Sequence, residues 1–182
     1  MHTNTLAFLE KYGDEPITSI SVFRRPLCGN IDKTANILTF GKFVKKLKRA
    51  GYTQLYHTGL LMNGKYLFEK WLDIGVHITA DTSHYEYYPV NMAGVSVTLR
   101  QFYMNGIQQY GDAIWKYDIC DNNCQKVVLQ ILDANHLETE LTKKFMFQDM
   151  SGVLSPIERK HITNMLKIPF HFAKKQGLFR LV

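Results

Sequence analysis

One cysteine stands where thiol chemistry could use it. Cys124 follows Asn122 and Asn123 in "NNCQ" and precedes apolar residues at helical spacing, so it falls in the first turn of a predicted helix. The helix dipole lowers the pKa of a thiol there, and the first backbone N–H groups can bind an oxyanion. The alternative is a small side chain that only packs a core helix. If the thiol is a nucleophile, we expect it to be less buried than a core cysteine.

His57 is the candidate base, and Glu69 is the candidate partner that would hold its ring. Both flank Asn63-Gly64, a dipeptide typical of a β-hairpin, in "YHTGLLMNGKYLFEKW". A three-residue loop, Met62-Asn63-Gly64, with positive φ at its glycine after two right-handed residues, would place His57 directly across from Glu69. A two-residue loop would turn these side chains to opposite faces of the sheet. We expect the three-residue loop.

Several neighbouring polar residues are further candidates for the site. Gln125 could donate a hydrogen bond to an oxyanion. Asn123 could line the cleft, although a role for Asn122 or Asn123 as helix cap is the simpler interpretation. Tyr117 and Asp118 could also line it. An alternative set that could orient the base consists of His77, Asp81 and His84.

The spacing of cysteines and histidines indicates neither a disulfide framework nor a metal centre. The chain has 3 cysteines, and they form no pair of CxxC motifs: Cys28, Cys120 and Cys124. Three histidines outside the hairpin lack the spacing of metal ligands: His136, His161 and His171. We therefore expect no metal and no other cofactor.

The order of the predicted elements indicates an α+β fold with a small antiparallel sheet. A strand is predicted in "DEPITSISVFRRPL", the hairpin follows, and further strands lie in "VHITADTSHYEYYPVNMAGVSVT". One helix is predicted over about 97–110 and another from Cys124 onward. We expect one domain over residues 1–137 and a helical C-terminal extension, 138–182, packed on it. The last helix of the extension should end near Pro169.

A basic amphipathic helix is predicted over about 31–50, in a chain whose net charge is +6. Its positive residues are Lys42, Lys45, Lys46, Lys48 and Arg49. Its apolar stripe consists of Ile37, Phe40, Val44 and Leu47. We expect the stripe to pack on the sheet, so that the basic face can bind an anionic membrane surface or an acidic protein partner. The alternative is a solvated domain helix. No nucleic-acid motif accompanies it, and we expect no specific nucleic acid.

Two features bear on where the protein acts. No stretch approaches the roughly 18–20 apolar residues that a membrane span requires. The segment "MHTNTLAFLEKYGDE" lacks the charged and apolar regions of a signal peptide. We therefore expect synthesis in the cytosol, without secretion.

The ordered set of strand histidine, polar partner and "NC" at a helix start resembles a known group of enzymes. These are the circularly permuted papain-like enzymes, which include the lecithin:retinol acyltransferase family within the NlpC-type superfamily. The sequence is more similar still to members encoded by large DNA viruses of eukaryotes, in "EPITSI", "LTFGKF", "YHTGLLMNGKY" and "NNCQ". The resemblance covers roughly residues 12–135 and, more weakly, the C-terminal helices.

The resemblance implies a circularly permuted papain-like fold in which Cys124 is the nucleophile, His57 the base and Glu69 the orienting group. It implies a hydrolase or acyltransferase that acts on an amide, ester or thioester through an acyl-enzyme. The acyltransferases usually have a histidine at the third position and "NCEH", whereas this chain has Glu69 and "NCQK". A lipid substrate and transacylase activity therefore do not follow.

The resemblance also carries an alternative function from a different class. The protein could be a structural or interaction protein of a large DNA virus particle, such as a minor capsid component, that uses the same fold. The positive net charge and the aromatic run "HYEYYPV" would then provide surfaces for other virion proteins. The expected location is the cytoplasm of an infected cell, or the virion itself for the alternative.

Overall fold

The structure is a computed structural model that describes residues 3–27, 41–71, 74–78, 82, 84–150 and 152–164. The strands are β1 (Ile20–Pro26), β2 (Tyr56–Met62), β3 (Tyr66–Lys70), β4 (Ile74–Ile78) and β5 (Glu86–Val90). The helices are α1 (Thr3–Tyr12), α3 (Phe43–Arg49), α4 (Leu99–Tyr110), the short 3-10 helix η1 (Gly111–Trp115), α5 (Cys124–Ala134) and α6 (Glu140–Met146). Residues 156–164 are also helical.

The strands form one five-stranded antiparallel sheet in the order β4-β3-β2-β1-β5. The predicted α+β class with a small antiparallel sheet is therefore confirmed. Side chains alternate between the two faces of each strand. Val22 of β1, Leu60 of β2 and Phe68 of β3 lie side by side in the register and share one face. This face carries the main hydrophobic core.

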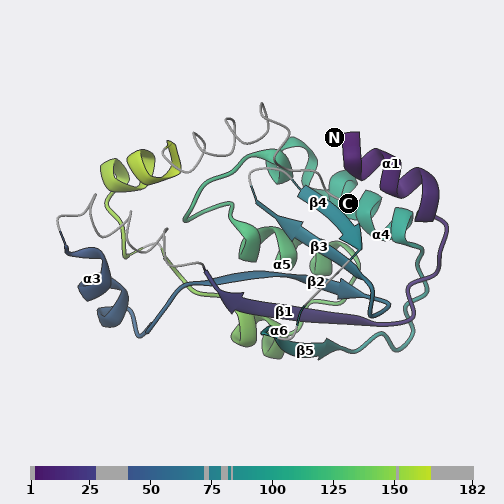
Figure 1. The fold of residues 1–182 in the computed structure, drawn as a ribbon, viewed down its shortest axis with the longest axis horizontal. Helices are drawn as coiled ribbons and strands as arrows, with labels where there is room; N and C mark the ends of the chain where they lie inside the picture. Colours follow the sequence, from purple (N-terminus) through teal and green to yellow (C-terminus); the bar gives the residue numbers. More distant parts are fainter. Residues whose placement is uncertain are drawn as a thin grey trace.

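The helices cover the core face of the sheet from its centre to one edge. Helix α5 lies against β2 and β3, α1 lies against β4, and α4 packs on α5 (Figure 1). The apolar face of α5 is fully buried because Val127, Val128 and Ile131 recur at helical spacing. Gly106 of α4 lets the two helices approach closely, since a Cβ there would collide with the Ile131 side chain.

A second hydrophobic cluster lies at the end of the molecule that carries α3 (Figure 1). It joins α3 to the segments before β2 and α5 and to the C-terminal part of the chain. Its buried residues are Phe43, Leu47, Leu55, Ile119, Met150, Val153, Leu154 and Ile162. Both β2 and α5 run from this cluster into the main core, so His57 and Cys124 lie where the two clusters meet.

The hairpin between β2 and β3 has a different register from the one the sequence favoured. Met62 pairs with Tyr66 and Gly59 pairs with Glu69, so the loop consists of residues 63–65. Gly64 has the expected positive φ of 66°, but Asn63 also has a positive φ, 53°, where a right-handed conformation was predicted. The predicted pairing of His57 with Glu69 is therefore wrong: in this register Glu69 lies across from Gly59, two residues further along β2 than His57.

A contact with the chain before β1 explains the turn. The Asn63 side chain accepts from the Thr18 N–H at 2.8 Å and donates to the Pro16 carbonyl at 2.9 Å. Asparagine tolerates positive φ better than most residues, and both central residues have the φ sign of a type I′ turn. The tether comes from more than forty residues away in the chain, so local spacing could not predict it.

The basic helix differs from its prediction in extent, in one apolar residue and in its packing, because α3 packs in the second hydrophobic cluster and not on the sheet. Helix α3 begins at Phe43 within the described residues, and the predicted Ile37 and Phe40 lie outside them. Leu47 is buried as expected, whereas Val44 is 39% exposed because Phe43 takes the inward position in its place. The opposite face of α3 carries its cations into solvent.

Other parts of the fold differ in how far the sequence predicted them. The helix predicted over about 97–110 is α4, whose cap residue Thr98 forms a capping box with Gln101. Helix α1 was not predicted. Helix α6 packs against β1 and β5, within the proposed C-terminal extension, and Pro169 lies outside the described residues. In the described part of the chain, no helix is both long and apolar enough to cross a membrane.

Candidate thiol site

The site is built at the beginning of β2, where this strand has separated from β3. The Leu27 N–H donates to the Leu55 carbonyl at 2.8 Å, so the Leu55 carbonyl faces β1. By alternation, the backbone groups of Tyr56 and Thr58 face the opposite side. The ladder between β2 and β3 begins only at Gly59, so β3 does not reach these groups.

The start of α5 and the segment after α6 take the place of the missing strand. The Tyr56 N–H donates to Gln148 Oε1 at 2.8 Å, and Gln125 Nε2 donates to the Tyr56 carbonyl at 3.1 Å. The Thr58 backbone N–H is directed toward the Cys124 sulfur and lowers the pKa of its thiol. The thiol therefore lies beside β2 rather than above one face of the sheet. This position lets it contact both His57 and Thr58, whose side chains point to opposite faces.

His57 is held on the far side from the thiol by Glu69. Its Nε2 lies 3.1 Å from Glu69 Oε1, which leaves Nδ1 as the ring nitrogen for Cys124. In the extended register His57 lies opposite Trp71, and Glu69 is its diagonal neighbour on the same face. The His57 and Trp71 rings stack at 4.1 Å between centroids and 17° between planes. His57 is 1% exposed. The predicted contact thus forms through a different register.

Arg25 completes this side of the site. It pairs with His57 across β1 and β2, and its guanidinium lies 3.7 Å from Glu69 Oε1. The guanidinium also lies over the rings of Trp71 and Tyr85, at 5.4 Å and 5.3 Å from their centroids. Sequence reasoning missed both Arg25 and Trp71. Pairing the predicted first strand with the histidine strand could have found Arg25.

The charges at the site favour a thiolate–imidazolium pair. Burial alone would lower the pKa of His57, but the Cys124 sulfur and Glu69 raise it to about 9. Burial alone would raise the pKa of the Cys124 thiol, but the His57 charge and hydrogen bonds from His57 and Thr58 lower it. Both shifts have the direction that stabilises Cys124 as thiolate and His57 as imidazolium.

Thr58 is a further residue that sequence reasoning missed. Its side chain is fully buried, and its hydroxyl has no hydrogen-bond partner among the described residues. The hydroxyl nevertheless lies close enough to Cys124 to contribute to the lowered pKa of the thiol. It faces the sulfur from the side opposite to His57. A buried hydroxyl gains most from this position when the sulfur is charged.

The burial of Cys124 contradicts one prediction. Only 9% of the residue is exposed, so it is not less buried than an ordinary core cysteine. The reason is the packing of β2, α5 and Gln148 around the helix start. Cys120 is more exposed, yet burial raises its pKa to about 11, and no imidazolium compensates it. The pKa shifts of the two thiols therefore differ because of their charged neighbours and not because of their exposure.

The polar residues around Cys124 either cap α5 or hold the neighbouring segments in place by hydrogen bonds. Asn123 caps α5 by accepting from the Lys126 N–H at 3.1 Å, and Asn122 donates to the Ala113 and Lys116 carbonyls. The Gln125 amide donates to Tyr56 and Gln148, so these contacts use both of its hydrogens. The proposed oxyanion role of its side chain therefore does not fit. The backbone N–H groups of Cys124 and Gln125, in the first helical turn, have no intrahelical acceptor and fit better.

The remaining sequence candidates contribute less. Asp81 and the side chain of His77 lie outside the described residues, as does Cys28, and His84 is exposed. Tyr117 lies near the thiol: burial and the charge of Cys124 raise its pKa. Among the described residues, no group of three histidine, cysteine or acidic side chains could hold a metal ion.

Taken together, the arrangement can supply a charged sulfur, a proton donor of pKa about 9 and N–H groups for an oxyanion. These are the requirements of nucleophilic attack on a carbonyl carbon. No protein-family model matches the sequence, and no curated protein or solved structure is significantly similar to it. The chemistry therefore has to be argued from the site itself.

Proposed function

We propose that the protein is a cysteine-nucleophile hydrolase or acyltransferase that acts on an amide, ester or thioester. The observation that carries the proposal is the chain of contacts from Cys124 through the His57 ring to Glu69, 3.1 Å from Nε2. The position of Cys124 at the start of α5, with the histidine and acid on neighbouring strands, supports a circularly permuted papain-like arrangement. Roles then follow: Cys124 as nucleophile, His57 as acid and base, Glu69 as the orienting group.

Acylation uses the charged pair directly. The Cys124 thiolate attacks the carbonyl carbon, and the carbonyl oxygen becomes an oxyanion that the first N–H groups of α5 can bind. When the tetrahedral intermediate collapses, the bond to the leaving group breaks and His57 gives that group its proton. The products are a thioester on Cys124, a neutral His57 and the protonated leaving group. Glu69 stabilises the ring before the transfer and keeps Nδ1 directed at the sulfur.

Deacylation reverses the proton transfer. Neutral His57 takes a proton from water, for a hydrolase, or from an acceptor alcohol, amine or thiol, for an acyltransferase. The deprotonated acceptor attacks the thioester carbon, and the sulfur leaves as thiolate. The pair of Cys124 and protonated His57 is thereby restored.

The first prediction concerns the reactivity of the thiol. Iodoacetamide at pH 7 should alkylate Cys124 faster than Cys120, because the pKa of Cys124 is lowered while that of Cys120 is raised to about 11. Incubation with p-nitrophenyl acetate should release a burst of nitrophenol and leave an acetyl group on Cys124. Mass spectrometry of proteolytic fragments measures both modifications.

Two variants control this experiment. His57→Gln should slow alkylation of Cys124 at pH 7 by about tenfold or more, since the charge that lowers the thiol pKa is lost. Cys120→Ala should leave both reactions unchanged. The proposal is wrong if Cys124 reacts no faster than Cys120 and no acetyl-enzyme forms in the native protein.

The second candidate function is that of an interaction protein with the same fold and no catalytic activity. The observation that favours it is the burial of Cys124, which is 9% exposed, together with the exposed cations of α3. In this case the protein is an interaction protein, such as a minor component of a virus particle. It would bind its partners through its surface, and its thiol would stay inert in the experiment above.

A further inference from the structure

A pocket lies between the helical segment 156–164 and the loop that leads into α5 and Cys124. It has a volume of about 360 Å³, within the range of small-molecule sites. Its lining residues are Tyr117, Asp118, Pro156, Arg159, Lys160, Thr163 and Asn164. The C-terminal part of the chain thus forms one wall of the pocket, and the loop before Cys124 forms the other.

The loop of residues 117–122, which precedes Cys124 in the chain, is held by its own backbone contacts and by Arg159. Asp118 and Asn122 bridge each other through their backbones, so Tyr117 is brought back toward Cys124. Arg159 Nε lies 2.7 Å from Asp118 Oδ1, and the same guanidinium binds Asp121. The bridge between Asp118 and Asn122 therefore ties the pocket wall formed by Tyr117 and Asp118 to the start of α5, two residues before Cys124.

The chemistry of the walls is rich in hydrogen-bond donors. Tyr117 stays protonated as a donor because burial and the charge of Cys124 raise its pKa. Asn164 carries an amide, and Lys160 carries an ammonium group that has no ion-pair partner among the described residues. The carboxylates that face the pocket region are Asp118 and Asp121, and both are held by Arg159. Lys160 is therefore the charge available to a ligand.

We propose that this pocket is the subsite that selects the substrate, and that it takes a group bearing a carboxylate or a phosphate. The inference rests on the proposed function, because it assigns the pocket to the substrate of the Cys124 reaction. Lys160 would pair with the anion, and Tyr117 and Asn164 would donate hydrogen bonds to its oxygens. The acyl or leaving group that carries the anion would thereby be held next to the sulfur.

The test compares two alkylating probes of nearly equal size. Iodoacetate carries a carboxylate and iodoacetamide does not, and each loses iodide as the Cys124 thiolate forms a carbon–sulfur bond. The ratio of their rates at Cys124 should fall about fivefold in Lys160→Gln, the size of one exposed ion pair. Lys160→Arg should keep the ratio. Lys144→Gln, a change of equal charge at an exposed position of α6, should leave it unchanged.

Added inorganic phosphate and succinate then identify the anion. The one that fits the pocket should slow the iodoacetate reaction in the native protein at constant ionic strength and lose this effect in Lys160→Gln. If the rate ratio is unchanged in Lys160→Gln while Cys124 still reacts with iodoacetamide, the pocket is not the anion-binding subsite, and the proposed function is unaffected.

A separate measurement tests the pocket in the case that the Cys124 thiol is unreactive. If neither probe alkylates Cys124, the proposed function fails, and the pocket is judged by titrating phosphate and succinate into the native protein. Shifts of the backbone amide NMR signals of Thr163 and Asn164 that disappear in Lys160→Gln would retain it as an anion site only. The absence of shifts with either anion would overturn it as well.

Discussion

Glu69 controls the proton on His57 from a distance of 3.1 Å. Its carboxylate is nearly buried, and the Arg25 guanidinium at 3.7 Å favours its ionised form. A buried negative charge next to an imidazole favours the protonated ring, so Glu69 offsets the burial that would otherwise make His57 neutral. The third residue of the site is therefore an electrostatic partner as well as a restraint on the orientation of the ring.

The second prediction follows from this charge. In the native protein His57 should lose its proton near pH 9, so the thiolate–imidazolium pair should be present from the lowered pKa of the Cys124 thiol up to about pH 9 and should disappear above it. In Glu69→Gln the pKa of His57 should fall by about one to three units, because one raising charge is removed while burial remains. NMR titration of the ring protons measures the shift.

Two variants complete the titration. His57→Gln identifies the His57 signals by their absence. Glu86→Gln changes a carboxylate on β5 that binds Arg24 and not His57, and it should leave the titration unchanged. If His57 titrates identically in Glu69→Gln and the native protein, Glu69 does not hold the charge of the ring.

At the scale of elements, what could be predicted from the sequence is what depends on near neighbours in the chain. The cap at Asn123 and the apolar spacing after it were sufficient to place Cys124 in the first turn of a helix. The hairpin was predicted as well, but its register was not. The register depends on the tether between Asn63 and Pro16, which lies outside any local window.

The same distinction applies to the partners of the site. Arg25 and Thr58 act through the pairing of β1 with β2 and through the separation of β2 from β3. Neither residue has a local motif. Gln125 was assigned by its sequence position next to the cysteine, yet its side chain points to Gln148 and the β2 backbone. Spacing along the chain identified the reacting groups, while pairing in space determines what surrounds them.

The third prediction tests the helix start. Asn123→Ala should lower the melting temperature by about 2–4 °C, the effect of losing roughly 1 kcal/mol of capping. It should also slow alkylation of Cys124 at pH 6 by about two- to fivefold, because the helix end that favours the thiolate is less well ordered. Thermal unfolding and timed alkylation measure the two effects on the same samples.

The matched control is the cap of another helix. Thr98 caps α4 with a side-chain hydrogen bond of 3.2 Å from the Gln101 N–H, far from the thiol in the chain. Thr98→Ala should therefore lower the melting temperature to a similar extent without changing the alkylation rate. Equal slowing in both variants would indicate that general loss of stability, and not the helix start, governs the thiol.

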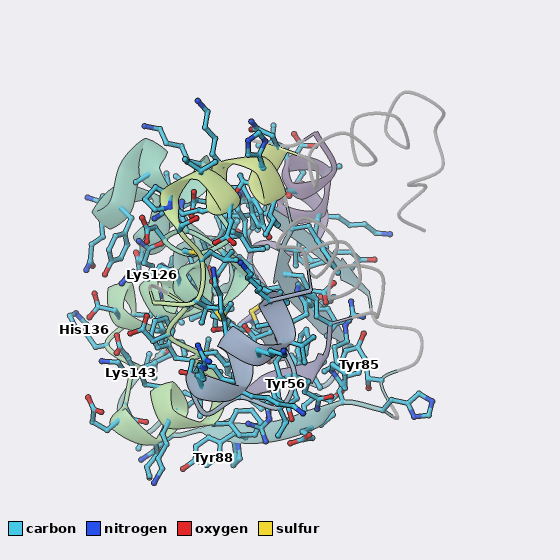
Figure 2. The ribbon with its side chains drawn as sticks, turned by 90° about the vertical axis from the view of Figure 1, so that its left-hand side faces the viewer. Tyr56, Tyr85, Tyr88, Lys126, His136 and Lys143 are labelled. Carbon is cyan, nitrogen blue, oxygen red and sulfur yellow. The ribbon has the colours of Figure 1, made fainter. Side chains whose placement is uncertain are left out.

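At the scale of the whole molecule, the site lies between the main core and the cluster around α3. The α3 end faces the viewer in Figure 2, with Tyr56 and Tyr85 on one side and His136 and Lys143 on the other. Lys46 of α3 binds Glu158 at 2.7 Å, so this lysine joins α3 to the segment that forms the pocket wall. The C-terminal part of the chain thus connects the basic surface to the site.

The last prediction concerns that basic surface. Phe43 and Leu47 of α3 are buried, so the helix has no continuous apolar face to insert into a bilayer. Apart from Lys46, which binds Glu158, the cations of α3 and its N-cap are exposed: Lys42, Lys45, Lys48 and Arg49. We propose that they bind anionic surfaces by charge alone, at about 1 kcal/mol per charge near an anionic membrane. Binding to anionic vesicles should then weaken as the Debye length falls from about 10 Å at 0.1 M salt to about 3 Å at 1 M.

Sedimentation with anionic and neutral vesicles tests this proposal. Replacing three lysines of α3 and its N-cap by glutamine, in Lys42→Gln, Lys45→Gln and Lys48→Gln, should reduce binding to anionic vesicles about a hundredfold at low salt, as three charges near the membrane require. The matched control replaces three lysines outside α3, in Lys116→Gln, Lys126→Gln and Lys144→Gln, and has the same net charge. Because only the first set lies on one helix face, the control should bind far better than the α3 variant. Equal binding by the two variants, or binding that survives 1 M salt, would show that α3 is not a charge-driven docking surface.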